Sequence, residues 1–221
     1  MLHFFHNSNS PGKTAFNADK AWKVMKQFDT HYLTLTAAKL EDQLFTKTLF
    51  IPPNLRTNEG HYLFYMRPSR YFPKLTSTPT ILDNLAYCMQ VMQEKEQCER
   101  DGIAFIANMN DWTMSNFSVE YCKRFMKMLQ VNIPVRVCLF LIVNPPSWFG
   151  KIWTVMKPLL SSDFRNKVHK IKEDKLANYL EPGFEKYLPD EFKVGTASTD
   201  DIVADFITYR KFVEASTNYA N

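Results

Sequence analysis

The spacing of apolar residues changes several times along the chain, and each change marks an expected element. Seven consecutive apolar residues at 137–143 are too few to cross a membrane and predict a strand that is buried on both faces. The run at 103–109 predicts a second buried strand, and the aromatic-rich run at 61–67 predicts a third.

Between these runs, apolar residues recur three and four positions apart, as is typical of amphipathic helices. Thr78 and Pro79 suit the cap and first turn of one such helix. The pattern predicts helices at 18–35, 37–49 and 78–100, one beginning at Ser118 and a last one beginning at Asp200, with 192–195 as an edge strand or a turn. Strands that alternate with helices indicate an α/β domain with a mainly parallel sheet.

A hinged, aromatic-rich helix is expected after the strand at 137–143. Asn144-Pro-Pro turns the chain, and the apolar residues that follow share one helix face, with Lys151 on the other. Pro158 lacks an N–H group and should kink or break the helix. Ser161 or Ser162 can then cap a second short helix, whose apolar residues would be Phe164, Val168 and Ile171.

Positive charge is concentrated in this same part of the chain. Residues 150–175 hold seven Lys or Arg and three acids, an excess equal to the whole net charge of +4. Such a local excess favours an anionic partner, and an ordinary solvated helix face is the alternative.

Motifs of enzymes are absent from the sequence. There is no glycine-rich phosphate loop, no nucleophile elbow, and no metal-ligand spacing among the five histidines or the four cysteines. We therefore expect no catalytic residue, no metal site, no cofactor and no enzymatic activity. The aromatic residues next to the basic segment lie on the apolar helix face, which argues against nucleic-acid binding.

The compartment is expected from the cysteines and from the N-terminal residues. The four cysteines are neither closely paired nor dense in the sequence, as is typical of reduced thiols in a cytosolic protein. The first residues have neither a long apolar region nor a basic leader, so we expect a cytoplasmic monomer whose membrane contact is peripheral.

Several blocks of sequence carry a family resemblance. Gly102-Ile-Ala-Phe-Ile-Ala-Asn-Met-Asn-Asp-Trp and Leu141-Ile-Val-Asn-Pro-Pro-Ser-Trp-Phe are two of them, and the full ordered set is 16–25, 102–116, 133–136, 141–149, 156–162 and 188–192. The chain resembles the CRAL-TRIO lipid-binding domain family over about residues 16–195. The resemblance implies an apolar pocket with the sheet as its floor and the helix after the Asn-Pro-Pro turn as a gate.

The resemblance also implies site residues. The alternation of side chains along each strand decides which face of the strand is used. Floor contacts would come from Leu63, Tyr65, Ala104, Ile106, Leu139 and Leu141. The gate would contribute Trp148, Phe149, Ile152, Trp153, Met156 and Leu160. Anionic head groups or a membrane surface would be contacted by Lys151, Arg165, Lys167 and Lys170.

Two departures from the family pattern shape the expected function. Residues 1–50 form only a reduced N-terminal helical part before the lipid-binding lobe at 51–221, and Val135 replaces an acid that phosphatidylinositol-binding members often carry. We expect binding and transfer, or sensing, of a hydrophobic or phospholipid ligand at membranes, with phosphoinositides included. The alternative is a ligand-free interaction module that docks an acidic protein or a membrane through its basic segment.

Overall fold

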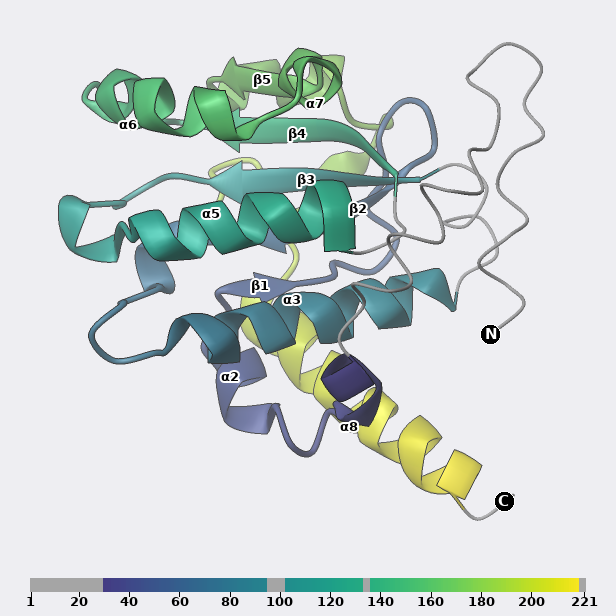
Figure 1. Cartoon of the computed structure of the whole chain (residues 1–221). Coiled ribbons are helices and arrows are strands. Elements are labelled where there is room, and N and C mark those ends of the chain that lie inside the picture. The colour runs from purple at the N-terminus through teal and green to yellow at the C-terminus, as the bar shows by residue number, and fades with distance from the viewer. Residues whose placement is uncertain (1–29, 95–101, 133–135, 219–221) are drawn as a thin grey trace, which may run out of the picture.

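A five-stranded sheet organises the computed structural model, which describes residues 30–94, 102–132 and 136–218 (Figure 1). The strands follow the chain order, β1 (Leu49–Phe50), β2 (Tyr62–Met66), β3 (Ile103–Asn108), β4 (Val137–Val143) and β5 (Val168–Ile171). β1 is antiparallel to β2, and the other neighbours are parallel. The expected α/β class with a mainly parallel sheet is confirmed.

Helices fill the connections, and local side chains begin several of them. Ser77 Oγ accepts a hydrogen bond from Thr80 N at 3.3 Å, and Ser118 Oγ accepts one from Tyr121 N at 3.1 Å. The α-helices are α2 (Glu41–Phe45), α3 (Thr78–Gln93), α5 (Val119–Lys127), α6 (Phe149–Met156), α7 (Ser162–Asn166) and α8 (Thr199–Asn218). Short 3₁₀ helices lie at Thr30–Thr34, Pro68–Arg70, Met114–Asn116, Lys157–Leu159, Glu173–Asn178 and Phe184–Lys186, and a π turn at Met128–Asn132.

Two expected helices are corrected by the structure. The helix predicted at 37–49 is limited to α2, because Leu49 and Phe50 pair with β2. Val168 and Ile171 lie in β5 rather than in a helix, since the backbone here pairs with β4. Their spacing from Phe164 fits a helix by coincidence, and the tertiary pairing decides the outcome.

The described end of the helix expected at 18–35 is instead the 3₁₀ turn Thr30–Thr34, and the helix expected at 78–100 is α3, which ends at Gln93. Pro158 ends α6 in the 3₁₀ turn Lys157–Leu159, Ser161 caps α7, and 192–195 is a turn. Residues 18–29, 95–101 and 133–135, which include Cys98 and Val135, lie outside the described residues. The described part of residues 1–50 contributes Ala37, Leu44 and Phe50 to the same core as the sheet.

The parallel register gives the sheet two different faces. Phe64, Phe105 and Phe140 are direct neighbours across three strands, with ring centroids 4.9 Å and 5.3 Å apart. Their face is covered by α5 and α7, through Phe125 at 6.3 Å from Phe140 and Phe164 at 6.3 Å from Phe140 (Figure 1). Side chains at the alternate positions point the other way.

The opposite face is covered by the segment between β5 and α8. On that face Tyr65 packs edge-on against Phe192, with centroids 5.9 Å apart, and His169 packs on Tyr179 at 5.5 Å. The Tyr65 hydroxyl donates to the Glu191 carboxylate, which also pairs with Arg70. Burial, together with the negative charge of Glu191, raises the pKa of Tyr65, so the phenol stays protonated.

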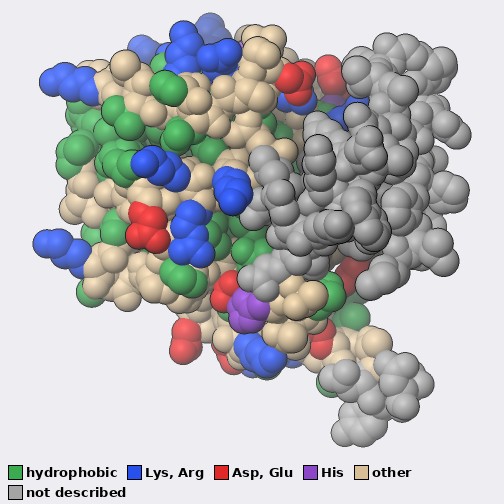
Figure 2. Space-filling model, viewed as in Figure 1, with side chains coloured by type: hydrophobic (Ala, Val, Ile, Leu, Met, Phe, Trp, Pro, Cys, Tyr) green, Lys and Arg blue, Asp and Glu red, His purple; other side chains and the backbone are tan. Residues whose placement is uncertain are grey.

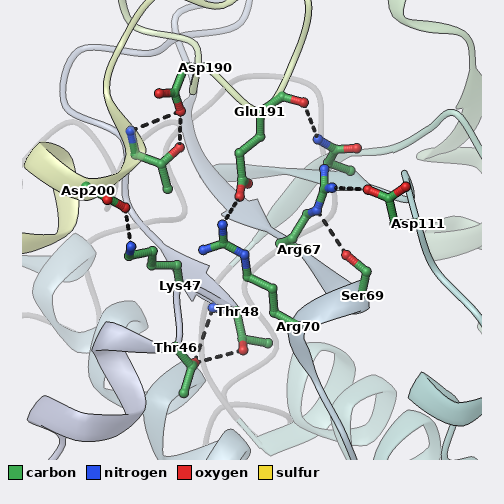
Figure 3. Close-up of polar contacts among 12 residues, drawn as sticks. Thr46, Lys47, Thr48, Arg67, Ser69, Arg70, Asp111, Asp190, Glu191 and Asp200 are labelled. Atoms are coloured by element: carbon green, nitrogen blue, oxygen red, sulfur yellow. Dashed lines mark hydrogen bonds and ion pairs between the residues drawn. The ribbon is translucent and has the colours of Figure 1, made fainter.

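A polar network at the carboxyl end of β2 holds this covering segment in place (Figure 3). Arg67 Nη2 pairs with Asp111 Oδ2 at 2.8 Å, and Arg67 Nε donates to Ser69 Oγ at 3.0 Å. Asp190 Oδ1 accepts from Thr199 N at 3.1 Å and thereby caps α8. The loop after β3 and the turn after β2 are therefore fixed to the end of β2, and the start of α8 is fixed to the covering segment.

The helix α8 is clamped to α3 by a buried arginine. Arg210 Nη1 and Nη2 contact the Glu94 carboxylate at 2.5 Å and 2.9 Å, and Arg210 Nε donates to the Tyr87 hydroxyl at 3.2 Å. That hydroxyl donates in turn to Glu214 Oε1 at 2.5 Å. Arg210 Nη2 also lies 3.7 Å from Glu214 Oε1, and the Glu214 side chain is only 18% exposed, whereas Glu94 is 55% exposed. Removing the guanidinium would therefore leave the largely buried Glu214 carboxylate without its cation.

We predict that Arg210→Leu lowers the free energy of unfolding by about 3 kcal/mol, the usual cost of breaking a buried ion pair from one side. Lys211→Leu is the matched control, because Lys211 is more than one-third exposed in its pair with Glu41 and should cost less than about 1 kcal/mol. Urea unfolding followed by circular dichroism measures both. If the two variants lose equal free energy of unfolding, the buried Arg210 pair stabilises the domain no more than the exposed Lys211 pair.

Candidate functional site

An apolar cavity of about 90 Å³ lies against the phenylalanine face of the sheet. Its floor comes from strands β2 to β5, and its other walls come from α5, from α6 and the residues that follow it, and from the 109–118 loop. The main lining residues are Met66, Ala107, Phe140, Ile142 and Val168 from the strands, Tyr121, Cys122, Phe125 and Met126 from α5, and Phe149, Trp153, Met156, Leu160 and Phe164 from the segment 149–164.

Aromatic side chains form continuous contacts around this cavity. Tyr71 packs on Tyr121 with centroids 4.8 Å apart, and Tyr121 packs on Phe125 at 5.6 Å. On the other side, Trp112 stacks on Trp148 at 4.8 Å and meets Phe149 edge-on at 6.0 Å. The wall is therefore built of large apolar surfaces that suit hydrocarbon.

The cavity is uncharged. Its lining contains no Lys, Arg, His, Asp or Glu. Burial raises the pKa of the Cys122 thiol to about 12 and raises the pKa of the Tyr121 phenol, so both groups stay protonated near neutral pH. Within the described ranges, no cluster of His, Cys, Asp or Glu could hold a metal ion. The arrangement suits binding of an apolar molecule.

The helix α6 closes the cavity, and side-chain amides fix both ends of its segment. Before α6, Asn144 Nδ2 donates to Asn110 Oδ1 at 3.1 Å and Asn144 Oδ1 accepts from Glu173 N at 3.0 Å. After α6, Gln130 Nε2 donates to Leu159 O at 3.1 Å and Gln130 Oε1 accepts from Ser161 N at 2.8 Å. Between these hydrogen bonds the backbone is helical and does not pair with a strand of the sheet.

Few buried side chains hold α6 itself. Only Phe149 and Ile152 of this helix are buried, while Val155 is 51% exposed. The Lys170 ammonium lies 5.2 Å from the centroid of the Trp153 ring, a cation–π contact between β5 and α6. A helix with so little buried area costs little to displace compared with α3, which buries eleven residues.

The structure places the floor residues that were named from the sequence on the sheet face opposite the cavity. These six positions lie on the face covered by the C-terminal segment and are absent from the cavity lining: Leu63, Tyr65, Ala104, Ile106, Leu139 and Leu141. Every residue of β3 is buried, so its sequence does not distinguish the two sides of the sheet. Phe140, Ile142 and Ala107 face the cavity instead.

The gate residues are placed mostly as expected. Phe149, Trp153, Met156 and Leu160 line the cavity. Ile152 is buried beside it, and Trp148 stacks on Trp112, but neither is part of the lining. Contact of these residues with a lipid stays a prediction.

The basic residues named from the sequence lie near α6 but differ in exposure. Lys151 and Lys170 are exposed, whereas Arg165 and Lys167 are half-buried. Lys167 Nζ also pairs with Asp163 Oδ2 at 2.6 Å. Figure 2 shows blue side chains along the top of the molecule, over the region of α6, α7 and β5. A contact with anionic groups would therefore rest mainly on the exposed lysines.

Sequence reasoning missed the cavity wall that α5 and the 109–118 loop supply. Phe125 and Met126 lie on the helix that was expected to begin at Ser118, but nothing in the pattern showed what that helix covers. Tyr71 and Trp112 sit in loops, where periodicity gives no signal.

The model of the CRAL/TRIO domain matches residues 46–193, which is more than half of the chain. The chain belongs to the CRAL/TRIO family. The match includes all five strands, the 109–118 loop, α6 and the covering segment up to the turn at 192–195.

Curated relatives and a solved structure agree with membership in the CRAL/TRIO family. The chain is 24% identical over 139 residues to "Alpha-tocopherol transfer protein-like" of Mus musculus, covering 62% of this chain and 40% of that protein. It is 23% identical over 127 residues to "Tyrosine-protein phosphatase non-receptor type 9" of Homo sapiens, covering 58% of this chain and 21% of that protein. The crystal structure of Sfh5 superposes with a TM-score of 0.50 at 12% identity, over 69% of this chain and 56% of that one, and supports the fold.

These relatives are much longer than the region they share with this CRAL/TRIO domain. The chain spans less than half the length of either curated relative described above. Among the helices of the described ranges, none is long and apolar enough to span a bilayer.

We predict that the two faces of β3 respond differently to added volume. Ala107→Leu places its side chain toward the cavity and should change the free energy of unfolding by less than about 1 kcal/mol. Ala104→Leu is the matched control on the filled face, where overpacking should cost about 1–3 kcal/mol. Urea unfolding of the two variants measures the difference. If Ala107→Leu loses as much stability as Ala104→Leu, the cavity face is as densely packed as the other.

Proposed function

We propose that this CRAL/TRIO domain binds one hydrophobic lipid molecule between α6 and the sheet and carries it between membranes. The observation that supports the proposal most is the uncharged, aromatic-walled cavity beneath a sparsely buried helix. Apolar walls stabilise hydrocarbon by about 25 cal/mol for each Å² removed from water. Membership in the CRAL/TRIO family also supports the binding and transfer of a hydrophobic ligand.

The proposed gate movement follows from the size of the cavity. Its volume of about 90 Å³ is well below the roughly 300–1,000 Å³ typical of ligand pockets. A lipid therefore fits only if one wall moves outward. The sheet cannot move without breaking backbone pairing, whereas α6 can move between its anchors at Asn144 and Gln130.

We propose that the basic segment brings the domain to anionic membranes, including those that carry phosphoinositides. Lys151, Lys157, Lys170 and Lys172 are exposed on or near the closing helix. Val155, 51% exposed on α6, offers apolar surface next to them. Docking here would place the cavity mouth at the bilayer, where a hydrophobic ligand can leave without crossing water.

The alternative, a ligand-free interaction module that docks an acidic protein or a membrane, shares the basic segment but does not need the cavity. Its lining would then be a loosely packed part of the core. Substitutions on the inner and outer sides of α6 separate the two functions, because only a lipid carrier depends on the inner side.

We predict that Phe149→Asp abolishes lipid retention. Phe149 lines the cavity at 5% exposure, and an unpaired carboxylate placed against hydrocarbon costs several kcal/mol. Thr154→Asp, at an exposed polar position of the same helix, is the matched control and should retain lipid. Each protein is incubated with vesicles and re-purified, and its bound lipid is extracted and quantified. Unchanged retention by a folded Phe149→Asp protein would favour the interaction module.

We also predict that changing Lys151, Lys170 and Lys172 together to Gln weakens binding to anionic liposomes by roughly a hundredfold. Each basic residue near an anionic surface contributes about 1 kcal/mol, within a Debye length of roughly 8 Å at physiological salt. Changing the exposed Lys39, Lys186 and Lys193 to Gln removes the same charge elsewhere and should have little effect. Sedimentation with phosphatidylserine or phosphoinositide vesicles measures both. Equal losses in the two triple variants would refute a localised docking surface.

A further inference from the structure

Two hydrogen-bond donors are buried without partners in the wall of the apolar cavity. The Tyr71 hydroxyl and the Trp112 indole Nε1 are both sealed from solvent, and neither has an acceptor within the described part of the chain. Tyr71 is 3% exposed and Trp112 is 8% exposed, and both residues line the cavity. Buried polar atoms are nearly always hydrogen-bonded, so two unpaired donors in one wall point to a missing partner.

Two other polar side chains of this wall, Asn116 and Thr48, already have partners. Asn116 Nδ2 donates to the backbone oxygens of Ser69 and Tyr71, each at 2.9 Å, and Asn116 Oδ1 accepts from Thr113 N at 2.9 Å. The Thr48 hydroxyl lies 2.8 Å from the Thr46 hydroxyl. Tyr71 and Trp112 are therefore set apart from their polar neighbours.

The same contacts join the backbone at Tyr71 to the backbone that follows Trp112. Asn116 ties the backbone of Tyr71 to the turn that begins directly after Trp112. Trp112 also packs against α6, through Trp148 and Phe149. Outward movement of α6 would remove these contacts and uncover the Trp112 side of the wall to an incoming molecule.

Charge restricts what kind of group could bind there. An indole N–H only donates, so the partner must be an acceptor. With no basic side chain in the lining, an ionised carboxylate or phosphate at this position would be buried without a counter-charge. A hydroxyl, ester or carbonyl oxygen meets both conditions.

We infer that the cavity takes a neutral lipid whose hydroxyl, ester or carbonyl oxygens accept hydrogen bonds from Tyr71 and Trp112. This inference rests on the proposed lipid-binding function and specifies its ligand class. The hydrocarbon part of the ligand extends toward Met156, Leu160 and Phe164, beneath the end of the α6 segment. Anionic head groups would contact the basic outer surface and not the cavity.

The test compares three probes with the same hydrocarbon chain: tetradecane, methyl tetradecanoate and, at pH 8, ionised tetradecanoate. Each displaces the fluorophore 1-aminoanthracene from the parent protein, from Tyr71→Phe and from Tyr187→Phe. Tyr187 is 39% exposed and outside the cavity lining, so it controls for loss of a phenol hydroxyl elsewhere. Comparing each variant with the parent for one probe at a time cancels differences in probe solubility.

We expect Tyr71→Phe to weaken the binding of methyl tetradecanoate by about fivefold to tenfold, which is the usual effect of one lost hydrogen bond. The affinity for tetradecane should stay within about twofold of the parent value. Tyr187→Phe should change neither. Ionised tetradecanoate should bind the parent at least about tenfold more weakly than the ester, because the wall lacks a counter-charge.

Three results would overturn the inference. If Tyr71→Phe affects the ester and the alkane equally, the hydroxyl does not bind the ligand oxygen, although lipid binding itself stands. Ionised tetradecanoate binding as tightly as the ester would refute the neutral class. If no probe displaces the fluorophore, both the inference and the proposed function fail.

Discussion

The in-register pairing of β2, β3 and β4 is the constraint on which the rest of the structure depends. It places Phe64, Phe105 and Phe140 side by side on one face and sends the alternate residues to the other. A shift by one residue would exchange the faces completely. The two faces then differ in what covers them: a polar-anchored segment packs on one, and helices that enclose a cavity cover the other.

The covering elements differ in how firmly they are held. Glu191, bound by Tyr65 and Arg70, fixes the segment after β5 to the sheet, and Arg210 fixes α8 to α3. By contrast, α6 is secured at its two ends by side-chain amides and by two buried residues between them. Rigid support on one face and a weakly held helix on the other suit a container whose lid moves while its floor does not. On our proposal, the exposed lysines near α6 make the lid the part that meets the membrane.

Much of this architecture could be predicted from the sequence, because strand and helix periods differ clearly along the chain. The strands at 61–67, 103–109 and 137–143, the break at Pro158 and the helix beginning near Asp200 are confirmed. β5 could not be recognised, since Val-His-Lys-Ile is short and fits either period. β1 is only two residues long and exists through its pairing with β2.

The candidate site was less accessible to sequence reasoning. The apolar side of α6 follows from spacing within one helix, so Phe149, Trp153, Met156 and Leu160 could be named. The floor residues could not be assigned, because both faces of β3 are buried and only the placement of α5 decides between Ala104 and Ala107. Tyr71 and Trp112 come from separate loops that Asn116 joins in three dimensions.

The central claim is that this domain holds one lipid molecule between α6 and the sheet, and native mass spectrometry of protein purified from cells tests it most directly. The account predicts a folded monomer carrying a single non-covalent lipid, which is released on activation in the gas phase and identified from the organic extract. A folded protein that carries only the mass of its polypeptide, even after incubation with lipid vesicles, would contradict it.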